Sequence, residues 1–366
     1  MIVNKKRSLS QKLVGLLILL IAFIIWVMIN YYEKMAIAED YQKRLLIIDK
    51  LEKFDLSSVN LDEISFLDSL DPKLLEVGEN EMTKHKVVIV GIARDNMDDI
   101  LVMIKNIDYI GGLFKDYRVI IFENDSKDGT KIALDIWQKK NSKIKIVSED
   151  FANKKRPNHK FMAEVRNKYL SELEDKEYNE FDIVMMVDID MSYGIDIRAI
   201  EDSFSKIDRW DAVCANGIAN AKGRMYDMFA FRNDEFPFSP KQWQEICSMD
   251  ASTDKWVSKC EKGVSLSKGW IHDAFAFRSG WQGINRLYWL RIVPQGQKIY
   301  PVNSNLVPVE SCFGGLAFYK HEFIEGCRYD SIDDDCEHVS FHRCLKDKHN
   351  GKMMMNPAQI IRYSQY

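Results

Sequence analysis

The segment FDIVMMVDID, residues 181–190, constrains the fold of this chain more than any other. It is an apolar run with the character of a buried strand, and it ends in two carboxylates, Asp188 and Asp190. A buried strand of an α/β sheet delivers its carboxyl end to the edge where ligands bind. Side chains two apart on a strand point the same way, so these carboxylates repel unless a cation lies between them. Mg²⁺ or Mn²⁺ suits such oxygen ligands, whereas the alternative is an ordinary strand end with solvated acids.

Strand-like and helix-like segments alternate along residues 86–190. The expected strands are KVVIVGIA (86–93), YRVIIFEND (117–125), KIKIVSED (143–150) and residues 181–190. The expected helices cover about 97–110, 130–137 and 159–173. Such alternation predicts right-handed β-α-β units, and hence an α/β, Rossmann-like fold with a mostly parallel sheet flanked by helices.

The charge balance and the missing motifs exclude several classes of function. The formal net charge of -4 provides no basic field, so a nucleic acid partner is not expected. The sequence has neither the G-x-x-x-x-G-K-[ST] loop nor a G-x-G-x-x-G turn after a strand, and it lacks a G-x-S-x-G elbow. These absences disfavour P-loop, dinucleotide-binding and α/β-hydrolase chemistry.

Residues 13–29, LVGLLILLIAFIIWVMI, form an uninterrupted apolar run without charge. At about 1.5 Å per residue the run spans roughly 25 Å as a helix, which is close to a hydrocarbon core. Basic residues precede it and acids follow it, so the positive-inside rule keeps residues 1–12 cytosolic. We therefore expect a single-pass type II membrane protein, facing the Golgi lumen if eukaryotic and otherwise the cell envelope. The rival is a cleaved signal peptide, which usually has a shorter apolar region.

The remaining sequence divides into a stem and one large domain. Residues 30–84 are charged, with scattered apolar positions and little glycine, and they read as a helical stem. Residues 85–366 then form the globular domain. All seven cysteines lie in the C-terminal half, without a C-x-x-C pair, so a structural zinc site of that type is not expected. Disulfides are possible, and an odd count leaves one thiol over.

Polar residues gather at the ends of the expected strands. Glu123 and Asp125 end the second strand, where carboxylates can accept hydrogen bonds from a ribose or a nucleobase. Arg94 follows the first strand, and Arg166 lies on the helix before Asp188. The planar donors of arginine suit a diphosphate, although a surface ion pair is the alternative for each.

Four features together resemble nucleotide-sugar glycosyltransferases of the GT-A type. They are the strand that runs into the END-S-x-DGT turn, the turn itself (123–130), the R-N pair at 166–167 and the strand ending in D-x-D. Later segments are similar to the fungal capsule-associated α-1,3-mannosyltransferase family. These segments are DAVCANGI (211–218), YDMFAFR (226–232), PVESCFGGLAFYK (308–320) and DDDCEHVSFH (333–342). The resemblance covers about residues 86–345 and implies a GT-A fold and a metal-dependent hexosyltransferase.

The resemblance also implies roles for particular residues. Asp188 and Asp190 would hold Mn²⁺ or Mg²⁺ on the donor diphosphate, with His338 or His342 completing the metal shell. The other implied sets are the donor contacts Arg94, Glu123, Asp125 and Arg166, the acceptor loop with Glu310, Gly314 and Gly315, and a catalytic base at Asp335 or Glu337 if the enzyme inverts. The glycines would let backbone approach a sugar closely.

The implied reaction transfers a hexose, with mannose as the first candidate and GDP-mannose as its donor, to a glycan acceptor. Two alternatives remain open. A metal-dependent nucleotidyltransferase or phosphotransferase would also hold a diphosphate on paired aspartates. A membrane-tethered glycan-binding module with an inactive site would retain metal binding without turnover.

Overall fold

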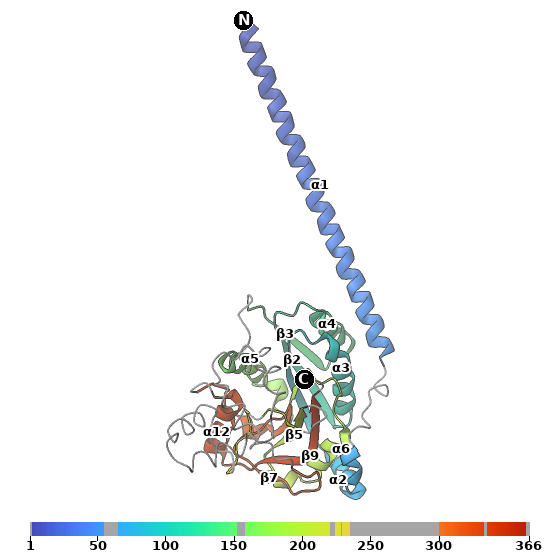
Figure 1. Cartoon of the computed structure of the whole chain (residues 1–366), viewed down its shortest axis with the longest axis vertical. Helices are drawn as coiled ribbons and strands as arrows, with labels where there is room; N and C mark the ends of the chain where they lie inside the picture. The colour runs from blue at the N-terminus through green and yellow to red at the C-terminus, as the bar shows by residue number, and fades with distance from the viewer. Residues whose placement is uncertain are drawn as a thin grey trace, which may run out of the picture. The chain divides into compact units, whose positions relative to one another are not determined.

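The computed structural model describes residues 2–54, 65–151, 158–219, 224–227, 229–234, 300–332 and 335–363, and it separates into two units, residues 1–53 and 54–366. The first unit is helix α1 (Ile2–Lys53), whose side chains are described from residue 21 onward (Figure 1). Residues 21–53 of this helix are long and apolar enough to cross a membrane. Phe23 and Trp26 are both exposed on it. The helix continues through residues 29 and 30, the predicted boundary between anchor and stem.

The second unit is built on one sheet. Its strands are β1 (Lys86–Ala93), β2 (Asp116–Glu123), β3 (Ile144–Ser148), β4 (Ile183–Asp188), β5 (Ala212–Ala219), β6 (Arg224–Met225), β7 (Val307–Pro308), β8 (Leu316–Lys320) and β9 (Met353–Tyr363). Its helices are α2 (Pro72–Met82), α3 (Met97–Gly112), α4 (Thr130–Lys140), α5 (His159–Glu172), α6 (Ile197–Phe204), α11 (His321–Ile324) and α12 (Glu337–His349). Single 3₁₀ turns cover Ser65–Ser69, Lys176–Tyr178 and Ile207–Arg209.

The strand order is β3-β2-β1-β4-β8-β5-β9-β7, with β6 paired to β5. Strands β1 to β4 pair in parallel, as do β5 and β9, and antiparallel β8 lies between β4 and β5. Most of these strands therefore share one direction, which confirms the predicted α/β class with a mostly parallel sheet flanked by helices. The elements between residues 86 and 188 begin and end within three residues of the expected ones.

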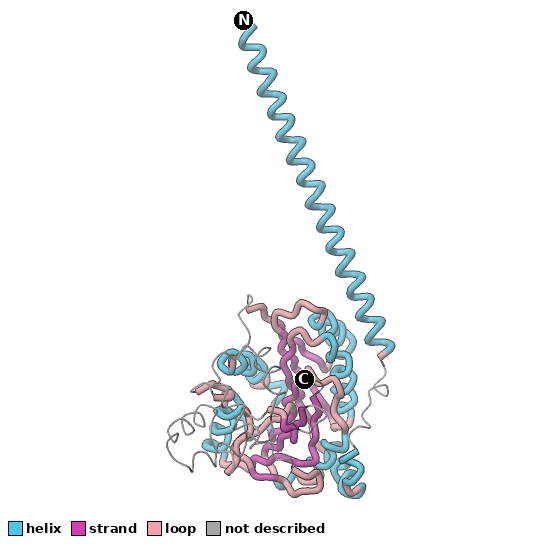
Figure 2. The backbone as a smooth tube through the Cα atoms, viewed as in Figure 1, coloured by secondary structure: helices cyan, strands magenta, loops and turns pink. Residues whose placement is uncertain are grey.

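Helices cover both faces of the sheet. Val88, Ile120 and Val184 pack in one apolar cluster with Tyr169 of α5 and Phe341 of α12. Helices α3 and α4 lie on the opposite side of the strands (Figures 1 and 2). Because β1, β2 and β4 are covered on both faces, their middle residues are apolar, and charged residues such as Asp116, Arg118 and Asp188 lie toward the strand ends.

Helix α2 belongs to the second unit, although it falls within the predicted stem. Asp71 caps it by accepting the N–H of Lys73 at 3.0 Å, and Pro72 occupies its first turn. Gly78 packs so closely on α6 that an added Cβ would lie 1.8 Å from the carbonyl oxygen of Glu201. The compact unit therefore begins earlier in the sequence than the expected boundary at residue 85.

The strand register gathers several strand ends at one edge. Ala93 of β1 pairs with Glu123 of β2, and Ile92 pairs with Asp188 of β4. The last residue of β9, Tyr363, reaches the same edge and contacts Asp188. We call this the carboxyl edge of the sheet, and it carries the candidate site.

Candidate active site

Asp188 is fixed at the carboxyl edge by contacts from three parts of the chain. Its backbone N–H donates to the carbonyl oxygen of Gly315 at 2.9 Å. Its side chain accepts a hydrogen bond from the hydroxyl of Tyr363, and Nη2 of Arg166 lies 3.7 Å from its Oδ1. The carboxylate therefore has a set orientation before any ligand arrives.

Three carboxylates crowd this position, and their pKa values are raised. Burial raises the pKa of Asp188, against the opposing effect of Arg166. Surrounding protein and the charge of Asp188 raise the pKa of Asp190 to about 7, although its side chain is exposed at the mouth of the sheet. Burial and Asp188 also raise the pKa of Asp227 to about 8. Such an excess of negative charge favours a divalent cation, but in the described part of the chain these three carboxylates do not form a group whose ligand atoms all lie within 4.8 Å of one another. Binding of Mg²⁺ or Mn²⁺ by Asp188 and Asp190 therefore stays a prediction.

Asp227 was not among the residues predicted from the sequence. Its backbone adopts a φ of 60°, which is uncommon for a residue with a side chain. The preceding residue, Tyr226, stacks on Tyr363 with ring centroids 3.5 Å apart. The segment YDMFAFR carried a usable signal, because it places an acid after an aromatic residue and belongs to the family resemblance.

Arg166 joins the site to a carboxylate that is distant in sequence. Its Nε donates to Oε1 of Glu337 at 3.1 Å, and its side chain is 7% exposed. The guanidinium also lies over the ring of Phe313, 5.0 Å from the centroid. Burial alone would raise the pKa of Glu337, but His159 and Arg166 hold it well below the usual range. Arg166 is thus committed to Glu337 and Asp188, and Glu337 is an ionised partner of Arg166 rather than an available base.

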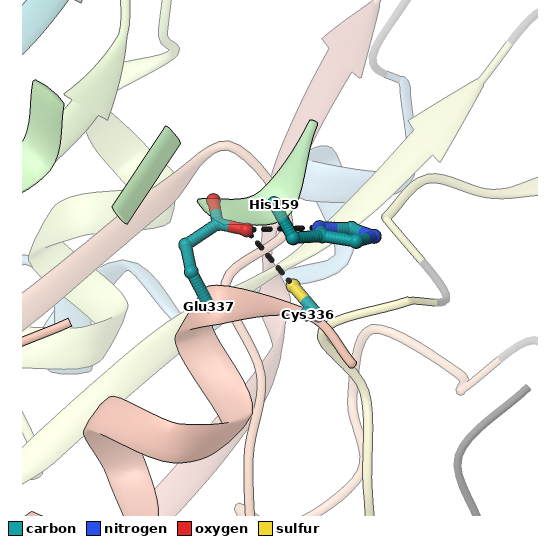
Figure 3. Close-up of side chains that lie close together, drawn as sticks. All are labelled: His159, Cys336 and Glu337. Atoms are coloured by element: carbon teal, nitrogen blue, oxygen red, sulfur yellow. Dashed lines mark hydrogen bonds and ion pairs between the residues drawn. The ribbon is translucent and has the colours of Figure 1, made fainter. Parts of the chain in front are cut away.

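The start of α12 lies against the start of α5. Nδ1 of His159 is 3.0 Å from Oε2 of Glu337, and the thiol of Cys336 donates to the same oxygen at 3.7 Å (Figure 3). The ligand atoms of these three residues all lie within 4.8 Å of one another. Among the described residues they form a possible metal-binding group that differs from the predicted set.

The two late histidines occupy different environments. His342 is fully buried, with Nδ1 2.8 Å from Oγ of Ser311 and Nε2 2.8 Å from the hydroxyl of Tyr319. Burial lowers its pKa to about 3. Both nitrogens are thus hydrogen-bonded inside the core, and a role of His342 as metal ligand stays a prediction. His338 is buried and stacks on Phe313 at 4.2 Å, and a role as metal ligand stays a prediction for it.

The loops after β1 and β2 are tied together by hydrogen bonds. The N–H of Asp95 donates to Oγ of Ser126 at 3.1 Å. In return, the carboxylate of Asp95 accepts the N–H of Lys127 at 2.7 Å. The N–H of Met97 donates to Asp128 at 2.7 Å. The DGT part of the motif is therefore accounted for by loop structure, as a turn and helix start.

Glu123, Asp125 and Arg94 differ in how far they can reach a donor. Glu123 is completely buried, and its oxygens accept the Ser126 N–H at 3.0 Å and the Ser148 hydroxyl at 2.5 Å. This geometry shows that Glu123 holds the loop, and a donor contact stays a prediction for it. Asp125 is half-buried with a φ of 53°. The side chain of Arg94 is 30% exposed, and for Asp125 and Arg94 donor binding stays a prediction.

The predicted acceptor loop is packed against protein. An added Cβ on Gly314 would lie 2.5 Å from the carbonyl oxygen of Ala215, and one on Gly315 would lie 2.6 Å from the hydroxyl of Tyr363. Both glycines have positive φ, so these positions require glycine for two reasons. The close approach seats Tyr363 against Asp188, and contact with a sugar stays a prediction.

The other acids proposed for this region form ion pairs. Glu310 is exposed and pairs with Nζ of Lys346 at 2.5 Å. Asp335 accepts from Nη2 of Arg232 at 2.6 Å, so it neutralises a buried arginine instead of standing as a free base. A catalytic role for Asp335 stays a prediction. Asp333 and Asp334 lie outside the described residues.

Two disulfides cross-link the C-terminal half. Cys214 bonds Cys312, which joins β5 to the segment before β8, and Cys327 bonds Cys344 of α12. Cys336 carries a free, buried thiol, and burial raises its pKa. Cys247 and Cys260 lie outside the described residues.

A family model described as Cryptococcal mannosyltransferase 1 matches residues 97–348. The match includes every member of the carboxylate group Asp188, Asp190 and Asp227. No curated protein sequence matches the chain.

Several solved structures show a distant likeness. Mannosyltransferase PcManGT from Pyrobaculum calidifontis, in complex with GDP-Man and Mn²⁺, is 12% identical with a TM-score of 0.38, over 77% of this chain and 57% of that one. Residues 1–349 of S. aureus TarS are 13% identical with a TM-score of 0.38, over 76% and 60%. M. tuberculosis glucosyl-3-phosphoglycerate synthase is 11% identical with a TM-score of 0.35, over 79% and 73%. The chain thus spans less than two thirds of the first two proteins.

Proposed function

We propose a function from one premise: this chain belongs to the cryptococcal mannosyltransferase 1 family, whose model matches residues 97–348. The proposed reaction is transfer of a hexose from a nucleoside-diphosphate sugar to a hydroxyl of a glycan acceptor. Mannose is the first candidate sugar, and GDP-mannose is its donor. The observation that carries the proposal is the position of Asp188 at the carboxyl edge of the sheet, where the hydroxyl of Tyr363 donates to it and Arg166 lies 3.7 Å away, with Asp190 two residues later.

The chemistry follows from where charge develops. When the anomeric bond breaks, negative charge builds on the leaving diphosphate oxygen. Asp188 and Asp190 would hold a divalent cation, which when bound stabilises that charge. Arg166 is buried, so its role is to orient Asp188 and to balance part of the acidic group, not to grip the donor from solvent. This places Arg166 among positioning residues instead of donor contacts.

The acceptor side requires a different assignment from the one the sequence suggested. Glu337 and Asp335 are each paired with a buried arginine, at 3.1 and 2.6 Å. Among the acids that the structure describes here, we assign Asp227 as the base of an inverting reaction, and burial together with Asp188 raises its pKa to about 8. A retaining enzyme would use Asp227 only to complete the acidic group.

The test is a transfer assay on the detergent-solubilised full chain, with GDP-mannose, UDP-glucose and UDP-N-acetylglucosamine as donors and Mn²⁺, Mg²⁺ or EDTA. We expect release of one nucleoside diphosphate, abolished by EDTA. Asp188→Asn and Asp190→Asn should each lower turnover by about 10³-fold, which is about 4 kcal/mol of transition-state free energy. Turnover close to wild type in either variant at saturating metal would refute the site.

The membrane arrangement is also a proposal. Helix α1 can cross a membrane by length and composition, and lysines and an arginine precede residue 13 while acids follow residue 29. We therefore place the N-terminus in the cytosol and the domain on the far side, in a Golgi lumen or a bacterial envelope. A C-terminal tag should resist protease in sealed microsomes or spheroplasts. Digestion of the tag from the cytosolic side would reverse this orientation.

A further inference from the structure

The group formed by His159, Cys336 and Glu337 combines three chemically different metal ligands in one place (Figure 3). His159 is the first residue of α5 and Glu337 the first residue of α12. Cys336 and Glu337 are buried, and the side chain of His159 is 15% exposed. The two helix starts thus meet at an imidazole, a thiol and a carboxylate that together form a partly accessible site.

The spacing of these atoms matches tetrahedral zinc. Bonds of about 2.3 Å to sulfur and about 2.1 Å to nitrogen or oxygen place tetrahedral ligands about 3.6 Å apart for sulfur and oxygen, and about 3.4 Å apart for nitrogen and oxygen. The observed separations from Oε2 of Glu337 are 3.7 Å to Sγ of Cys336 and 3.0 Å to Nδ1 of His159. These two separations are within a few tenths of an ångström of the tetrahedral values, and all three ligand atoms lie within 4.8 Å of one another.

The surroundings of Glu337 support the same reading. Its two oxygens face different partners: Oε1 accepts from Nε of Arg166 at 3.1 Å, and Oε2 faces His159 and Cys336. A metal on Oε2 would leave the Arg166 contact intact. Arg166 would then orient the ligating carboxylate, as hydrogen-bonded partners of metal ligands usually do.

We propose that His159, Cys336 and Glu337 form a zinc site that cross-links the starts of α5 and α12, with water in the fourth position. Binding releases the thiol proton of Cys336 to solvent, and the proton between Nδ1 of His159 and Glu337 also leaves to solvent, so that the neutral imidazole keeps its proton on Nε2. The thiolate and imidazole select a borderline-soft metal such as Zn²⁺, whereas Mg²⁺ prefers the all-oxygen ligands Asp188 and Asp190. The ligands of this site differ from those of the carboxylate group, although Arg166 links the two, since it lies 3.1 Å from Glu337 and 3.7 Å from Asp188.

The competing explanation is a set of hydrogen bonds that packs two helices and binds no metal. Cobalt distinguishes the two, because Co²⁺ replaces Zn²⁺ and reports its ligands through its spectrum. The full chain in detergent is stripped of metal, titrated with Co²⁺, and compared with Cys336→Ser, His159→Gln and the control His321→Gln, whose histidine lies on α11. We expect a thiolate-to-cobalt charge-transfer band and tetrahedral visible bands in wild type and His321→Gln.

Zinc content and affinity complete the test. Wild type should retain one Zn²⁺ per chain after dialysis, and Asp188→Asn should retain it too. Cys336→Ser and His159→Gln should weaken zinc binding by about 100-fold or more, because loss of an outer-shell partner alone costs about 10–100-fold. Equal metal-free melting temperatures establish that these variants fold. Octahedral cobalt without the thiolate band, or unchanged zinc affinity in Cys336→Ser, would overturn the proposal.

Discussion

The two ends of β4 carry aspartates in opposite electrostatic situations. Asp182 directly precedes the strand, where it bonds His85 and accepts the N–H of Lys86 at 2.8 Å. Burial would raise the pKa of Asp182, but these bonds hold it below its usual value. At the other end, burial raises the pKa of Asp188. The pKa values of Asp190 and Asp227 are raised as well. One end of the strand is electrostatically satisfied, and the other has more acid than the protein itself neutralises.

This difference in charge pairing indicates a functional site better than the size of a cavity does. A cavity of about 690 Å³ opens at the Asp182 end, beside His85 and Lys320. Two of the charged pairs beside it are already formed, since Lys320 bonds Asp211 at 2.8 Å and His85 bonds Asp182. The carboxyl edge instead concentrates like charges whose repulsion a bound cation would relieve. Perturbed carboxylates with a specific partner are the better indicator of a functional site.

The largest expected effect is on stability, and it compares the loss of a buried arginine at the carboxyl edge with the loss of a lysine at the opposite edge. Arg166→Met should lower the free energy of unfolding by about 3–5 kcal/mol, because it leaves Glu337 and Asp188 buried without their partner. Lys86→Met removes an ion pair with Glu180, whose side chain is 61% exposed. This loss should lower the free energy of unfolding by about 0.5 kcal/mol. Urea unfolding of both variants measures the difference. Similar costs would show that Arg166 does not bridge the two acids.

The next effect has the opposite sign at the two edges. Asp227 keeps its proton in the folded chain up to about pH 8, while the unfolded chain releases it near pH 4, so stability falls as pH rises between these values. Asp227→Asn should therefore stabilise metal-free protein at pH 8 by about 1 kcal/mol, and much less at pH 4. Asp182→Asn should destabilise it modestly at pH 6, since it weakens the pair with His85.

Thermal unfolding in EDTA across pH 4 to 8 compares these variants. If Asp227→Asn destabilises the protein throughout this range, the inference that acids repel one another at the carboxyl edge is wrong.

The sequence predicted the first half of the sheet well because its signals are local. Strands β1 to β4 are nearly continuous apolar runs, and turns and helices of ordinary length separate them. Those elements needed no knowledge of distant contacts. β4 ends at Asp188, so the strand period does not extend to Asp190, and the predicted pairing of the two carboxylates stays a prediction.

The rest of the site depends on contacts between distant parts of the chain. Arg166 and Glu337 are 171 residues apart, and Asp188 and Tyr363 are 175 apart. Antiparallel β8 between β4 and β5 brings these segments together, and periodicity alone does not specify that order. For the same reason, a histidine one turn along α12 could be read as a metal ligand although His342 is bonded inside the core.

The comparison of the two ends of β4 rests most directly on whether metal binds one of them. Melting temperatures of wild type, Asp188→Asn and Asp182→Asn should be measured with and without Mn²⁺ plus a nucleoside diphosphate. At about 100 times the dissociation constant, the ligands should stabilise wild type and Asp182→Asn alike by about 2.7 kcal/mol. Asp188→Asn should lose this shift while keeping its fold. An undiminished shift in Asp188→Asn, or a shift lost in Asp182→Asn, would contradict the assignment of the carboxyl edge as the active site.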